Sequence, residues 1–169
     1  MRRIEIREPF LGASRAEVER LYMLDDAFNE ATFRALGFAR EVTAQSTTGD
    51  TLERVLTLTP LHALPGPFAA LLPAGLLRIT EHVSYDFRTH RGRWRTTPSA
   101  LASQFRAEGT LALEDAAGGV VFALEGAADA SIPLLGGRAE KHAVHTATAQ
   151  HQALAAAIRK QLAAHRAAS

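Results

Sequence analysis

The stretch LLGGRAEKHAVHTATAQHQALAAAIRKQLAA, residues 134–164, decides the fold. It contains no proline, and alanine is its commonest residue. Placing successive residues about 100° apart puts five apolar side chains within one stripe. These residues are Val144, Ala147, Leu154, Ile158 and Leu162. The stretch therefore predicts one amphipathic helix, much longer than the average of about 11–12 residues, which needs a broad apolar surface to cover.

Most of the chain before this helix alternates apolar and polar residues with a period of two, which is typical of half-buried strands. Strands are expected at residues 4–10, 38–47, 51–59, 77–87, 90–97, 105–113 and 120–124. After the first strand, Ser14 and Glu17 have the spacing of a capping box, and a second short helix is expected from 27 to 36, ended by Gly37. Gly49-Asp50 and residues 115–119 provide turns.

This order of elements predicts an α+β fold of the helix-grip kind. A curved antiparallel sheet of six to seven strands must bury its apolar face, and only the last helix is long enough to cover it. A sheet of this size twists and curls. A single helix laid along a curved sheet leaves room between the two layers, so we expect a cavity there.

Composition narrows the classes of protein that fit. The chain has 169 residues, enough for one domain spanning 1–169, and it has no cysteine. Its 47% hydrophobic and 22% charged residues exclude a disordered chain or a coiled coil. A net charge of +1 gives no field that would recruit nucleic acid, and it is compatible with a monomer or a weak homodimer. No signal peptide is visible at the N-terminus, so a cytoplasmic location is expected.

Two local stretches resemble a known family. They are ITEHVSYD, residues 79–86, and IPLLGGRAE, residues 132–140, in which a proline and a Gly-Gly pair open the long helix. Both are similar to stretches of an uncharacterised, domain-of-unknown-function branch of the bacterial START-like (SRPBCC) superfamily, which includes the birch pollen allergen and lipid-transfer domains. The resemblance covers essentially the whole chain and implies a pocket for a hydrophobic ligand. Neither stretch is a catalytic signature.

Three polar residues are predicted on surfaces that should face the cavity. Glu81 is in register with Ile79 and Val83, where a lone carboxylate costs free energy unless it is paired or protonated. Glu140 and His151 fall near the middle of the apolar stripe of the long helix. Each could orient a ligand. The alternatives are a wet or arginine-paired Glu81, an ion-paired Glu140 and a core His151 satisfied by one hydrogen bond.

The remaining ligand-binding candidates belong to the same predicted inner surface or to its mouth. They are Tyr85, Trp94, Phe105, Ala147, Phe68 and Leu72. Phe68 and Leu72 lie in the apolar, proline-rich segment at residues 61–77, which is too long for a hairpin loop. This segment could cap the core, act as a mobile gate or make a transient membrane contact.

Other chemistry is not indicated. His142 and His145 share a helix face that is expected to be opposite the apolar stripe, and no further ligand completes a metal site. Arg91, Arg93 and Arg95 alternate with Trp94, so the arginines are expected outside and the indole inside. The sequence also lacks a phosphate-binding glycine loop, a nucleophile elbow and a His-Glu-x-x-His motif. No catalytic residue, metal or cofactor is therefore predicted.

These observations favour a non-enzymatic protein that binds or transports a small hydrophobic or amphipathic ligand, such as a lipid or a polyketide-like compound. The first alternative is a cavity enzyme of cyclase, dehydratase or isomerase type with Glu81 or His151 as the acid–base group. A second alternative is an interaction module with a filled core. Small residues at Ala107, Gly109 and Ala147 either leave open space, which argues against a filled core, or let the helix and the sheet approach closely.

Overall fold

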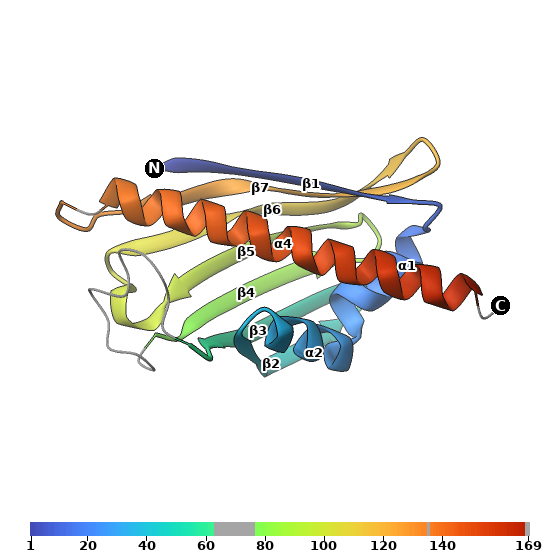
Figure 1. The fold of residues 1–169 in the computed structure, drawn as a ribbon, viewed down its shortest axis with the longest axis horizontal. Coiled ribbons are helices and arrows are strands. Elements are labelled where there is room, and N and C mark those ends of the chain that lie inside the picture. The colour runs from blue at the N-terminus through green and yellow to red at the C-terminus, as the bar shows by residue number, and fades with distance from the viewer. Residues whose placement is uncertain (63–76, 135, 168–169) are drawn as a thin grey trace.

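The structure, a computed structural model, describes residues 1–62, 77–134 and 136–167. In this part of the chain, seven strands form one antiparallel sheet in the order β1-β7-β6-β5-β4-β3-β2. The strands are β1 (Arg2–Leu11), β2 (Phe38–Thr48), β3 (Thr51–Pro60), β4 (Ile79–Asp86), β5 (Arg91–Pro98), β6 (Phe105–Ala116) and β7 (Gly119–Ala130). The long helix α4 (Gly136–Ala167) runs diagonally across one face of this sheet (Figure 1). The predicted α+β, helix-grip-like class is confirmed.

The sheet is built from sequential hairpins, with one exception. Strands β2 to β6 each pair with the next strand along the chain, whereas β1 pairs with β7, the last. Ile6 lies opposite Leu124, and Val83 lies opposite both Arg54 and Trp94 in the two flanking strands. These pairs place alternate residues of every strand on the face that α4 covers. The expected strands differ from the observed ones by a few residues at their ends.

Short helices follow β1, and the longest of them lies over the β2 end of the sheet (Figure 1). The helix α1 (Arg15–Glu19) begins with the predicted capping box, in which Ser14 Oγ accepts from the Glu17 amide and the Glu17 carboxylate accepts from the Ser14 amide. A π-helical turn, η1 (Arg20–Leu24), then leads into α2 (Asp26–Ala35). The chain leaves α2 through Gly37, whose φ of +85° suits glycine.

The two halves of α4 pack differently against the sheet. In the C-terminal half, Leu154, Ala155, Ile158 and Leu162 are buried in the main core. Burying a leucine or isoleucine side chain contributes about 1.5–3 kcal/mol, so this half anchors the helix. In the N-terminal half, residues 142–151 carry mostly small or polar side chains and are only half-buried or exposed. Because alanine and threonine cannot reach the sheet, space remains beneath this half.

Candidate ligand cavity

A cavity of about 170 Å³ lies between the N-terminal half of α4 and the inner face of the sheet. Its lining is mostly apolar and comes from every strand of the sheet. The apolar residues include Ile4, Phe38, Trp94, Phe105, Leu124 and Ala147. The predicted candidates Trp94, Phe105 and Ala147 therefore all lie at the cavity. Ala107 lines it as well, whereas Gly109 allows close backbone approach, since an added Cβ would collide with the Glu125 carbonyl of β7.

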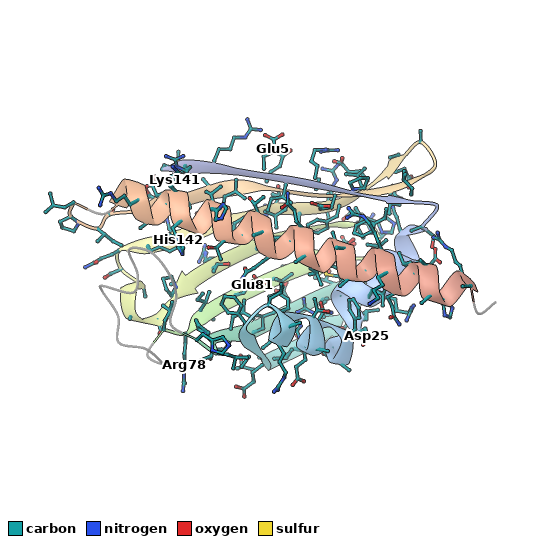
Figure 2. The ribbon with its side chains drawn as sticks, viewed as in Figure 1. Glu5, Asp25, Arg78, Glu81, Lys141 and His142 are labelled. Atoms are coloured by element: carbon teal, nitrogen blue, oxygen red, sulfur yellow. The ribbon has the colours of Figure 1, made fainter. Side chains whose placement is uncertain are left out.

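Glu81 brings a carboxyl group to this apolar surface. It lies on β4, opposite Leu56 of β3 and Thr96 of β5, and its side chain lines the cavity (Figure 2). Within the described part of the chain, no hydrogen bond or close ion pair engages this carboxyl group. Burial raises the pKa of Glu81, and the positive charges of Arg54 and Arg40 partly oppose that rise. Glu81 therefore presents free oxygen atoms to any occupant.

Arg54 is the cation next to Glu81, and it was not among the residues predicted from the sequence. It lies opposite Val83, two residues along β4 from Glu81, so the two side chains are diagonal neighbours on the inner face. The Arg54 side chain is only 4% exposed, and its Nη1 donates to the Met23 carbonyl at 2.9 Å. Burial lowers the pKa of Arg54, with the charge of Arg40 as the second cause.

Asp26 partly neutralises this buried positive charge. Its Oδ1 lies 3.0 Å from Arg40 Nη2 and 3.9 Å from Arg54 Nη1. Asp26 is the first residue of α2, so the ion pairs also hold this helix to β2 and β3. The sequence did indicate that Arg54 points inward. It alternates along one face of β3 with three buried leucines, Leu52, Leu56 and Leu58.

His151 and Tyr22 form the second polar group at the cavity. The Tyr22 hydroxyl lies 2.7 Å from His151 Nδ1, and both residues stack against Phe122. Burial lowers the pKa of His151 to about 4 and raises the pKa of Tyr22 well above its usual range. At neutral pH the imidazole is therefore uncharged and the phenol keeps its proton. The Tyr22 O–H donates to Nδ1, which assigns the ring proton to Nε2.

Two other predicted residues lie away from the cavity lining. Tyr85 is fully buried, and its hydroxyl donates to Glu19 Oε1 at 2.8 Å, beside His90 Nδ1 at 2.7 Å from the same oxygen. Glu140 accepts from the Ala130 amide at 3.1 Å and pairs with the amino group of Met1 at 2.8 Å. Both polar groups are therefore satisfied by protein partners. For Glu140, the observed contact agrees with the alternative hypothesis of an ion pair. Phe68 and Leu72 lie outside the described residues.

The structure corrects the expectation for His142. This side chain lines the cavity (Figure 2). His145 is exposed, as expected. The predicted stripe from Val144 to Leu162 assumes one inward side along the whole helix, but the helix crosses a twisted sheet, so a different side faces inward near residue 142. Within the described ranges, no cluster of three potential metal ligands occurs. On β5 the indole of Trp94 is buried and Arg95 pairs outside with Glu108, as predicted.

Comparison with known proteins places the chain in a family. A family model described as "Protein of unknown function (DUF2505)" matches residues 12–162. The chain belongs to the DUF2505 family. No protein with a curated description matches the sequence significantly.

Solved structures share the fold of this DUF2505 chain. TTHA0849 from Thermus thermophilus is 17% identical, with a TM-score of 0.61 over 96% of this chain and 97% of that one. CV1439 from Chromobacterium violaceum is 14% identical, with a TM-score of 0.60 over 94% of this chain and 97% of that one. At these identities the similarity concerns the fold. Among the helices of the described residues, none is long and apolar enough to cross a membrane.

The cavity of this DUF2505 member can recognise a polar group attached to an apolar body. Its apolar walls would supply most of the binding free energy, at about 25 cal/mol for each Å² of apolar surface removed from water. The Glu81 carboxyl group and the Nε2–H of His151 are free to make hydrogen bonds inside it. A few such groups on an otherwise apolar wall fix the orientation of a ligand.

Proposed function

We propose that this protein binds a small hydrophobic or amphipathic molecule in the cavity beneath α4, in the manner of the START-like superfamily. The observation that carries this proposal is an apolar cavity of about 170 Å³ whose wall holds an unpartnered carboxyl group, that of Glu81. A protein interior is normally close-packed, and a polar group withdrawn from bulk water normally has a partner. An occupant would fill the space and supply the partner.

The volume indicates the size of the ligand. An engineered apolar cavity of about 150 Å³ binds benzene. The space among the described residues of this chain therefore suits a compound of about one ring, at the small end of the polyketide-like class. A long acyl chain would need a larger space, so lipid transport requires the cavity to expand. A filled-core interaction module fits this volume less well.

Trp94 provides a direct test of occupancy, because it is the only tryptophan in the chain and it lines the cavity. Adding toluene should change the Trp94 fluorescence saturably. The variant Ala147→Phe places a ring in the cavity and should abolish this response. Ala156→Phe adds the same ring to an exposed position of α4 and should leave the response unchanged. Saturable binding that survives Ala147→Phe would place the ligand elsewhere and overturn the proposal.

The Tyr22–His151 hydrogen bond favours a second candidate function, a cavity enzyme of cyclase, dehydratase or isomerase type. A neutral imidazole held by a phenol can take a proton from a substrate, and Glu81 with its raised pKa can give one. The two candidates differ in the fate of the ligand. A compound recovered unchanged after long incubation supports binding, and a product of the same composition or one lacking water supports catalysis.

We also propose which partners other than the ligand this protein has. We propose no nucleic-acid partner, because the chain has nearly balanced charge. A monomer or weak homodimer and a transient membrane contact through residues 61–77 are proposed on the sequence alone. Residues 63–76 of that segment lie outside the described part of the chain.

A further inference from the structure

The charges around the cavity limit the charge that a ligand can carry. Arg40 and Arg54 supply two positive charges on the inner face, and Asp26 and Glu81 supply two carboxyl groups. Asp26 is already engaged by both arginines, so Glu81 is the carboxyl group left over for the cavity. The remaining titratable groups at the lining are Tyr22, His142 and His151. Burial lowers the pKa of both histidines and raises that of Tyr22, so these three groups are uncharged at neutral pH.

A charged ligand would meet a like charge in this arrangement. A carboxylate drawn to Arg54 would lie beside Glu81, its diagonal neighbour across the sheet. An ammonium group drawn to Glu81 would lie beside Arg54 for the same reason. Because Arg54 and Glu81 are diagonal neighbours on the two strands, an uncharged polar group avoids a like-charge contact with either and costs the least electrostatic free energy here.

The hydrogen-bonding groups limit the ligand further. The Glu81 carboxyl group offers an acceptor oxygen, and Nε2 of His151 offers a donor because Tyr22 already occupies Nδ1. A hydroxyl group both donates and accepts, so its chemistry matches the acceptor on Glu81 and the donor on His151. An ether or a ketone can only accept, and a hydrocarbon can do neither.

We propose that the natural ligand is an uncharged, ring-sized compound with a hydroxyl group that donates to Glu81 and accepts from His151 Nε2. This proposal rests on the binding function proposed above. The apolar body lies against the Trp94 and Phe105 side of the cavity. Glu81 and His151 thus act as specificity-determining residues. The apolar wall sets the size of the ligand, and these two residues select its functional group.

Four probes of similar size test the proposal: toluene, phenol, benzoate and benzylamine. Their dissociation constants at neutral pH are measured from the NMR signal of the single indole N–H, that of Trp94. Phenol should bind about tenfold or more tightly than toluene, as expected for one or two net hydrogen bonds. Benzoate and benzylamine should bind more weakly than phenol. Tighter binding of either ion would overturn the proposal.

A variant of Glu81 tests whether this residue causes the preference for phenol over toluene. Glu81→Met keeps the length of the side chain without its oxygens, so it should weaken phenol binding about tenfold and leave toluene binding nearly unchanged. Glu41→Met, at an exposed position of β2, is the matched control and should change neither constant. An unchanged preference for phenol in Glu81→Met would overturn the proposal. If that variant fails to fold, the wild-type protein still gives an answer, because phenol, and not toluene, should shift the Nε2 resonance of His151.

The failure of this inference differs from the failure of the proposed function. Toluene binding without a preference for phenol would remove the hydroxyl assignment and keep the binding function. The absence of binding by all four probes would contradict the binding of ring-sized ligands itself, and the hydroxyl assignment with it.

Discussion

Burial of His151 makes the stability of the protein depend on pH. Because burial lowers its pKa from 6.5 to about 4, the unfolded chain binds a proton between these values that the folded protein does not. The free energy of unfolding should therefore fall as the pH falls through this window, by up to about 1.4 kcal/mol per pH unit from this residue. His151→Phe removes this contribution. The contribution of Glu81 to this pH dependence has the opposite sign, because its pKa is raised in the folded protein. Glu81 is present in both the wild-type protein and His151→Phe, so its contribution cancels when their free energies of unfolding are subtracted.

Urea denaturation of both proteins at several pH values measures this difference. The wild-type protein should lose stability relative to His151→Phe as the pH falls from about 6.5 to about 4.5, with no relative change above about pH 7. Parallel pH profiles would contradict the neutral state assigned to His151.

At the residue level, the alternation of apolar and polar residues predicted that Glu81 faces the cavity. Helical spacing predicted the same for His151. Both patterns report which way a side chain faces, and facing inward is what these two residues do. The patterns do not report what a side chain meets there. Glu140 is buried too, but its carboxylate accepts from the Ala130 amide of β7, a contact between segments that the sequence leaves unspecified. The role of Tyr22 was not predicted, because it depends on its hydrogen bond to His151 of α4, a residue far away in the sequence.

At the level of elements, the two halves of α4 should differ in how much their side chains stabilise the fold. Ile158→Ala removes a side chain that is fully buried in the main core, so it should cost about 2–5 kcal/mol. Val144→Ala removes a half-buried side chain near the helix start, and the gain in helix propensity offsets part of its loss. Urea denaturation of the two variants should give a cost for Val144→Ala less than half that for Ile158→Ala. Equal costs would mean that both halves are packed alike.

The elements themselves were well predicted because their signals are local. The seven strands follow from alternation and the capping box from the spacing of Ser14 and Glu17. The inward side of α4 near His142 was not predicted, because it depends on how a straight helix crosses a twisted sheet. That relation is a property of two elements together, and a wheel drawn for the helix alone cannot contain it.

At the level of the whole molecule, a ligand in the cavity should stabilise the fold, because the site exists only when α4 lies on the sheet. A ligand that binds the folded state alone adds RT ln(1 + [L]/Kd), or about 2.7 kcal/mol at a hundredfold excess over Kd. Phenol should therefore raise the melting temperature of the wild-type protein and of Ala156→Phe, as followed by circular dichroism. Ala147→Phe should show no such rise, since its own ring occupies the space. An equal rise in all three proteins would show that phenol acts on the folded state outside the cavity, and the link between cavity and stability would then be wrong.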